Sequence, residues 1–235
     1  MSSENGDGSN KPDDSPESRA TEVRVWDLPL RLWHWALIAA LAVSLYTGLT
    51  GDITLFDLHK QAGYTVLGLL GFRVLWGLWG GIHTRWWRYG TTPMALWRYF
   101  RDIRKPGSHI LVRNPHTPPG ALMAIGLWCV VAVQAGTGLY SSDMIISRGP
   151  LVRGASDELV RNATWIHVRA FWLIFVLAGI HILAIACYHL FLKEPLAKAM
   201  ITGRKPFVGP ATPNYLIRAV LTLAAAAYTV RWIVT

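Results

Sequence analysis

The sequence predicts an all-α integral membrane protein: a bundle of four transmembrane helices, followed by a fifth, C-terminal transmembrane helix. Hydrophobic residues make up 52% of the 235 residues and charged residues only 16%, which excludes a soluble basic domain. The apolar residues are concentrated in long stretches with few charges. Many of the 12 tryptophans lie near the ends of these stretches, as in the interfacial belts of membrane proteins.

The four core helices are predicted from four apolar stretches close to the ~20 residues that span a bilayer. These stretches are Leu32–Thr50, Gln61–His83, Thr117–Ser142 and Ala170–Leu192. The second qualifies only if Arg73 is accommodated inside the bundle.

The fifth candidate span, Tyr215–Thr235, has a shorter apolar centre between Arg218 and Arg231. Both arginine side chains can extend to the membrane interfaces, so we expect a span. An interfacial helix is the alternative.

The chain is expected to divide into three parts. Residues 1–22 are polar and rich in Ser, Asp, Asn and Pro, which predicts a disordered cytoplasmic tail. The tail is acidic and no small-residue cleavage site follows the first apolar stretch, so it is not a signal peptide. Residues 23–206 are expected to form the four-helix membrane domain, and residues 207–235 a linker and the fifth helix.

The net charge of +9 follows the predicted topology. Basic residues gather before the first span, between the second and third spans, and after the fourth span. The positive-inside rule therefore places these segments in the cytoplasm. We expect a multi-pass protein of the bacterial inner membrane, surrounded by lipid, with a cytoplasmic N-terminus and no nucleic-acid partner.

Four histidines lie at two matched depths in the predicted spans. His167 and His181 are fourteen residues apart, just under four helical turns, so their rings share a face and lie about 21 Å apart along the axis. His34 lies at the inner end of the first span and His59 at the outer end of the second. Ionisable side chains inside membranes are usually functional. The pattern predicts two haems, an inner one bound by His34 and His181 and an outer one bound by His59 and His167.

Other residues at these depths are candidates to contact the haems. Gly48 is fourteen residues after His34, where the absence of a side chain would let a porphyrin approach. Arg73 is fourteen residues after His59, at the depth of the inner haem, and arginine suits the carboxylates of haem propionates. Three further cations lie beside the predicted ligands: Arg31, Lys60 and Arg169.

Each of these residues also has a simpler explanation. A single membrane histidine can hydrogen-bond a neighbouring helix, and Arg73 can line a water-filled cavity. The glycines, including Gly126, Gly136 and Gly138 of the third span, can serve only close helix packing. Four histidines at matched depths favour the haem interpretation.

Several segments of the sequence resemble the bacterial cytochrome b561 family, which includes the b-type subunits of membrane-bound nickel–iron hydrogenases. The most specific segments are Val25–Trp35, Leu58–Gly63, Phe72–Gly77 and Ile166–His181. The resemblance implies a four-helix core with two non-covalent b haems, and it makes His34, His59, His167 and His181 the positions that match the ligands. It also implies electron exchange between a membrane quinone, either ubiquinone or menaquinone, and a redox partner.

We therefore expect a membrane electron carrier between the quinone pool and a periplasmic c-type cytochrome or dehydrogenase subunit. The sequence has no nucleotide-binding or flavin motif, so whether the chain is itself an enzyme stays open. One alternative is a self-contained quinone reductase or superoxide oxidase of the same fold. The other is a haem-free cation or proton transporter.

Overall fold

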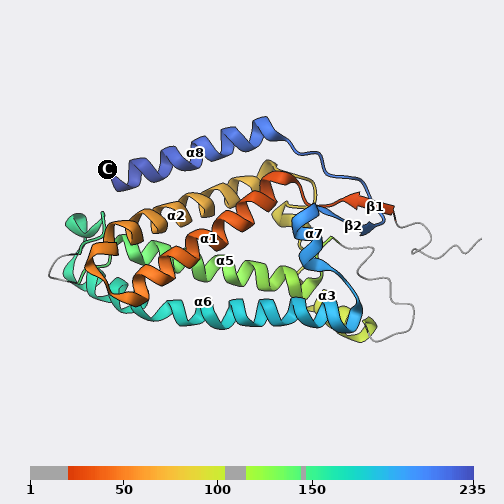
Figure 1. Cartoon of the computed structure of the whole chain (residues 1–235), viewed down its shortest axis with the longest axis horizontal. Helices are drawn as coiled ribbons and strands as arrows, with labels where there is room; N and C mark the ends of the chain where they lie inside the picture. The colour runs from red at the N-terminus through yellow and green to blue at the C-terminus, as the bar shows by residue number, and fades with distance from the viewer. Residues whose placement is uncertain (1–20, 104–114, 144–146) are drawn as a thin grey trace, which may run out of the picture.

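The computed structural model describes residues 21–103, 115–143 and 147–235, so nearly all of the predicted tail lies outside the described residues. Among these residues, five helices are long and apolar enough to cross a membrane, and the predicted all-α membrane fold is confirmed. They are α1 (Leu28–Thr50), α2 (Phe56–Trp79), α5 (Pro118–Leu139), α6 (Asp157–Leu192) and α8 (Leu216–Val234) (Figure 1).

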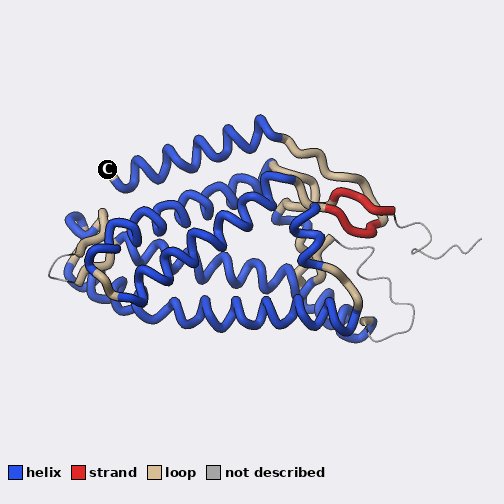
Figure 2. The backbone as a smooth tube through the Cα atoms, viewed as in Figure 1, coloured by secondary structure: helices blue, strands red, loops and turns tan. Residues whose placement is uncertain are grey.

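The shorter elements gather at the two ends of the bundle (Figures 1 and 2). One end, called here the strand end, carries an antiparallel pair of strands and two short helices. These are β1 (Thr21–Arg24), β2 (Arg204–Phe207), α3 (Pro93–Asp102) and α7 (Leu196–Thr202). The opposite end, called the loop end, carries two 3-10 turns, η1 (Ile53–Leu55) and η3 (Val152–Gly154). A third such turn, η2 (Trp86–Arg88), follows α2.

The starts of the spanning helices are explained by hydrogen-bonding caps. The side chain of Asp27 accepts from the backbone N–H of Leu30, and the Thr117 hydroxyl accepts in the same way at the start of α5. Ser156 caps α6, where Asp157 and Glu158 place negative charge against the positive end of the helix dipole.

Several predicted boundaries need correction. Helix α6 begins at Asp157, thirteen residues before the apolar stretch that predicted it, because a capped helix continues through charged residues outside the membrane core. Helix α2 begins earlier than predicted and ends at Trp79, where Gly80 leaves the helical conformation. Strand β1 begins at Thr21, inside the segment predicted as disordered.

The spanning helices pack as two pairs, α1 with α2 and α5 with α6, and α2 joins the pairs by contacting α5. Helix α8 lies along the outer side of α2 (Figure 1). The contacts between the two helices reveal their relative direction. Trp79 at the end of α2 donates to Thr222 in the first half of α8, whereas Gly68, earlier in α2, faces Val230 near the end of α8. Helix α8 therefore runs antiparallel to α2 from the strand end to the loop end.

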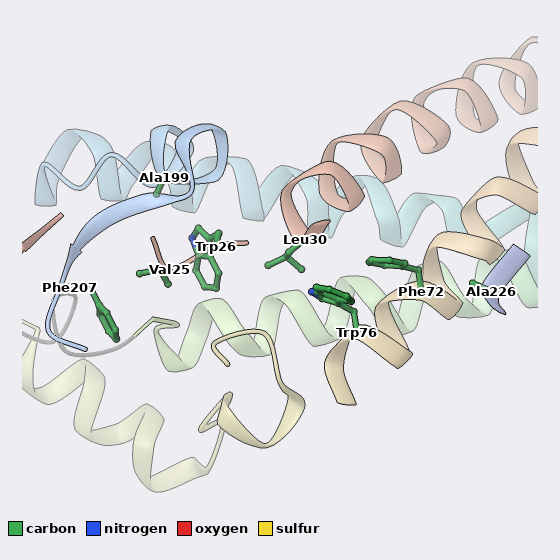
Figure 3. Packing of buried hydrophobic residues seen from close by; sticks show 8 residues of the cluster. All are labelled: Val25, Trp26, Leu30, Phe72, Trp76, Ala199, Phe207 and Ala226. Atoms are coloured by element: carbon green, nitrogen blue, oxygen red, sulfur yellow. The ribbon is translucent and has the colours of Figure 1, made fainter. Parts of the chain in front are cut away.

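Buried apolar side chains form two clusters. The strand-end cluster joins β1, β2, α1, α2, α7 and α8, and Figure 3 shows its members: Val25, Trp26, Leu30, Phe72, Trp76, Ala199, Phe207 and Ala226. The middle layer crosses the bundle and consists of Ala40, Val66, Leu70, Val131 and Ile174. Large apolar side chains such as Trp172, Ile182 and Phe191 are exposed on the outside of α6, as expected for a lipid-facing surface.

Candidate functional site

The fold brings the four spanning-helix histidines together as two pairs, one toward each end of the bundle. The ring centroids of His59 on α2 and His167 on α6 are 6.1 Å apart, with the rings nearly perpendicular. Toward the strand end, His34 on α1 lies near His181 on α6. The middle layer separates the pairs, since Ile174 lies seven residues from both His167 and His181.

The imidazole of His59 is oriented by α1. Its Nδ1 atom lies 3.0 Å from the backbone oxygen of Ser44 and 3.0 Å from the hydroxyl of Thr47. The Thr47 hydroxyl donates its proton to the Val43 carbonyl at 2.7 Å, so its oxygen accepts from His59. Gly48 packs against the same ring, where an added Cβ would lie 3.1 Å from Cε1.

The imidazole of His167 is oriented by α5 in a similar way. Its Nδ1 atom lies 2.9 Å from the backbone oxygen of Gln134. The Gln134 side-chain amide donates in return to the His167 backbone oxygen at 3.0 Å. Gly138 packs against the ring, where a Cβ would come 2.9 Å from Cε1.

These contacts determine which ring nitrogen is available to a metal. A carbonyl oxygen only accepts hydrogen bonds, so Nδ1 of His59 and of His167 must carry the proton. In a neutral imidazole the other nitrogen, Nε2, then has a free lone pair. A backbone carbonyl holding Nδ1–H is the usual support of a metal-binding histidine.

The distance between the two rings fits a shared iron. Imidazole–metal bonds are about 2 Å long, so two imidazoles on opposite sides of one metal ion have ring centroids roughly 6 Å apart. The His59 and His167 centroids are 6.1 Å apart. Within the described part of the chain, no three His, Cys, Asp or Glu side chains gather into a protein-only metal site. A haem iron needs only two protein ligands, because the porphyrin supplies the other four.

The pair toward the strand end has a different environment. The His34 ring contacts Trp35 edge to face, with centroids 5.3 Å apart. Nδ1 of His34 is buried and has no hydrogen-bond partner among the described residues. A ring with an unpaired buried nitrogen fits a site that a further group completes.

Arg73 is buried at the strand end of α2, only 3% exposed. It donates to the backbone oxygen of Thr84 and to the hydroxyl of Tyr89, and its guanidinium lies over the Trp86 ring, 4.1 Å from the centroid. Its Nη1 atom has no partner among the described residues. The contact with a haem propionate stays a prediction, and Nη1 is the atom available for it.

The other three predicted cations have protein partners. Arg31 donates to the backbone oxygen of Ile201 in α7, and its Nε atom is buried without a partner among the described residues. Lys60 forms a salt bridge with Asp57 at 2.8 Å. Arg169 lies over the Trp165 ring, 4.6 Å from the centroid. None of these contacts tests the predicted roles of the three residues toward a haem.

The strand end also holds His116, a half-buried residue for which the sequence analysis proposed no role. Its ring lies between Trp26 and Tyr89, tilted against both with centroids 4.6 and 4.4 Å away, and its Nε2 donates to the backbone oxygen of His83. Burial, together with the nearby charges of Arg73 and Lys205, lowers the pKa of His116 to about 3, and the hydrogen bond to the His83 backbone oxygen only partly opposes this shift. The ring is therefore neutral at physiological pH.

Sequence reasoning missed Ser44, Thr47 and Gln134, the residues that orient the loop-end histidines. A signal was present: a Thr-Gly dipeptide occurs in each of the two helices that hold these rings, at Thr47-Gly48 and Thr137-Gly138. Its meaning depends on how neighbouring helices are rotated, and the sequence does not reveal that rotation.

Comparisons with known proteins agree with this geometry. A family model described as prokaryotic cytochrome b561 matches residues 25–203. A relative from Azotobacter chroococcum mcd 1 is 27% identical over 87% of this chain and 95% of its own length. A relative from Rhodobacter capsulatus is 21% identical over 80% of this chain and 83% of its own length. Both relatives are named as probable Ni/Fe-hydrogenase B-type cytochrome subunits. No solved structure matches the chain.

Proposed function

The chain belongs to the prokaryotic cytochrome b561 family, so we infer that it acts as a multi-pass b-type cytochrome in electron transfer. We propose that it carries electrons between the quinone pool and a periplasmic redox partner. The observation that carries this proposal is the loop-end pair: two imidazoles with centroids 6.1 Å apart, each held through Nδ1 by a helix carbonyl. Two such ligands leave an iron no open position, which suits electron transfer.

The chain holds two haems in this proposal, bound by His34 with His181 and by His59 with His167. Each bound haem supplies a centre that takes up and releases one electron. The protein orients the loop-end rings, leaves room for them at Gly48 and Gly138, and offers the Nη1 atom of Arg73 to a propionate.

The distribution of charge supports a cytoplasmic strand end in the inner membrane. The segment between α2 and α5 and the segment after α6 are rich in arginine and lysine. By contrast, the α1–α2 connection holds Asp52 without a basic residue, and Asp57 follows in the first turn of α2. The loop end then faces the periplasm, where its acidic residues can steer a soluble partner with a complementary surface.

The names of the relatives suggest a dehydrogenase-type partner of the hydrogenase class. A c-type cytochrome is the other candidate, since Asp52 and Asp57 can attract a complementary basic surface. On the membrane side, the partner is ubiquinone or menaquinone.

Single-histidine variants test the ligand assignment. His34→Ala and His181→Ala should each leave one haem per chain, and His59→Ala and His167→Ala should each remove the other haem. The pyridine haemochrome assay on purified protein counts haems per chain, and His189→Ala is the matched control because His189 is exposed on the same helix. Two haems per chain in any of the four variants would contradict the assignment. A purified wild-type protein without a b-type difference spectrum would contradict the proposal as a whole.

A further inference from the structure

Helices α1 and α5 hold the loop-end histidines with the same local arrangement. In α1 the accepting carbonyl belongs to Ser44, with Thr47 three residues later and Gly48 four residues later. In α5 the accepting carbonyl belongs to Gln134, and Thr137 and Gly138 follow at the same spacing. We call each set of carbonyl, threonine and glycine a Thr-Gly cradle.

The two cradles agree in their detailed geometry. The Thr47 hydroxyl lies 2.7 Å from the carbonyl oxygen four residues earlier and 3.2 Å from that of Ser44. The corresponding distances for Thr137 are 2.7 and 3.1 Å. Threonine hydroxyls that bond back to the helix in this way disturb its regular hydrogen bonding. In both helices the disturbed carbonyl receives the imidazole N–H, and the glycine leaves the space that the ring occupies.

The strand-end pair has no equivalent support. Nδ1 of His34 is buried without a hydrogen-bond partner among the described residues, and no Thr-Gly dipeptide occurs in α2 or α6. Hydrogen bonds to Nδ1 control how strongly an imidazole donates electrons to a metal, so the two histidine pairs should differ in this donating strength. An imidazole that donates its N–H to a carbonyl is a more basic ligand.

We propose that the two Thr-Gly cradles make the loop-end site the lower-potential haem site, so that electrons run downhill from the loop end to the strand end. This inference rests on the proposed haem ligation. More basic ligands stabilise the oxidised iron and lower its reduction potential. The partner at the loop end is then oxidised, one electron at a time, and quinone at the strand end is reduced with protons taken from water. Thr47 and Gln134 act as positioning residues in this account, because they act through the imidazoles.

The first test compares proteins that retain one haem each. His34→Ala retains the loop-end haem and His59→Ala retains the strand-end haem, so each potential is measured without the charge of the other centre. Spectroscopic redox titration should give the lower midpoint potential for His34→Ala. Equal potentials, or the reverse order, would overturn the inference while leaving the ligation intact. If either variant still holds two haems, the ligation itself is wrong.

The second test changes one hydrogen bond to an imidazole. Thr47→Val removes one of the two acceptors of the His59 N–H, so the lower of the two wild-type potentials should shift upward while the higher stays unchanged. Thr47→Ser restores the hydroxyl and should restore the potential. The matched control is Thr65→Val, because the exposed Thr65 bonds back to Gln61 in the same way but touches no histidine. An unchanged lower potential in Thr47→Val would overturn the role of the cradle. If Thr47→Val binds no haem, the comparison of the single-haem proteins decides.

Discussion

Asp27 lies where three segments of the strand end meet. It is fully buried, caps α1 by accepting from Leu30 at 2.8 Å, and accepts from the indole of Trp76 in α2 at 3.3 Å. Gly81 lies so close that an added Cβ would come 2.1 Å from the carboxylate. Burial raises the pKa of Asp27, and the hydrogen bonds it accepts oppose that shift. One carboxylate thus joins the start of α1 to the end of α2.

Asp27→Ala should therefore destabilise the protein markedly. Loss of the cap costs about 1 kcal/mol, and leaving the Trp76 N–H unpaired costs about 1–3 kcal/mol more. Asp27→Asn retains an acceptor for both donors and should cost less. Thermal unfolding in detergent measures the effect, with the exposed Asp52 replaced by Ala as the control at another helix start. Equal melting temperatures for Asp27→Ala and wild type would refute this role.

His116 should make stability depend on pH. Its pKa is about 3 in the folded protein and 6.5 when unperturbed, so between these values the unfolded chain binds a proton that the folded chain does not. The contribution of the neutral His116 to the free energy of unfolding is therefore fully present above pH 6.5. It is lost as the pH falls, by at most about 1.4 kcal/mol per pH unit. His116→Gln retains a donor for the His83 carbonyl and should reduce the drop in Tm between pH 7 and pH 5. Replacing the exposed His189 by Gln should not. An unchanged drop in His116→Gln would show that other groups cause it.

At the scale of elements, apolar length predicted the helices but not their ends. The apolar part of α6 is only its membrane part, and the cap at Ser156 and the acidic first turn carry the helix thirteen residues further. The pairing of β1 with β2 joins segments 180 positions apart, Arg24 with Arg204, and Pro206 lies within β2. Two short strands with neither alternation nor a connecting turn give no sequence signal.

For the candidate site, the sequence predicted which histidines share a helix face but not which groups hydrogen-bond their rings. The fourteen-residue spacing indicates which histidines share a face, and this follows from helix geometry alone. The partners of their Nδ1 atoms depend on how α1 turns toward α2 and α5 toward α6, and the sequence does not encode that rotation in any short pattern. Ser44 and Gln134 contribute backbone carbonyls, which any residue could supply.

Helix α8 offers a sharp topological prediction. It runs antiparallel to α2 and ends at the loop end, so it should cross the membrane. Alkaline phosphatase fused after Thr235 should be active in the periplasm, whereas a fusion after Asn214, before α8, should be inactive. Activity of the Asn214 fusion, or inactivity of the Thr235 fusion, would contradict this topology. Both fusions should retain haem, because the contacts of the four histidines involve the other spanning helices.

At the scale of the whole molecule, polar chemistry is concentrated near the two ends of the bundle. The strand end combines the buried Asp27 and Arg73 and the half-buried His116 with an apolar cluster, and the loop end carries the hydrogen-bonded histidine pair together with Asp52 and Asp57. Between the ends, the outer surface is apolar and faces lipid.

The middle layer has an electrical consequence. Its five side chains, Ala40, Val66, Leu70, Val131 and Ile174, carry no polar group. Protons need a chain of hydrogen bonds to cross such a layer, whereas electrons do not. An electron that passes between the two histidine pairs therefore moves net charge through the electric field of the membrane, at about 2.3 kcal/mol per 100 mV for a full crossing. In the orientation and direction of electron flow proposed above, electrons move toward the negative cell interior, so an energised membrane should slow their transfer.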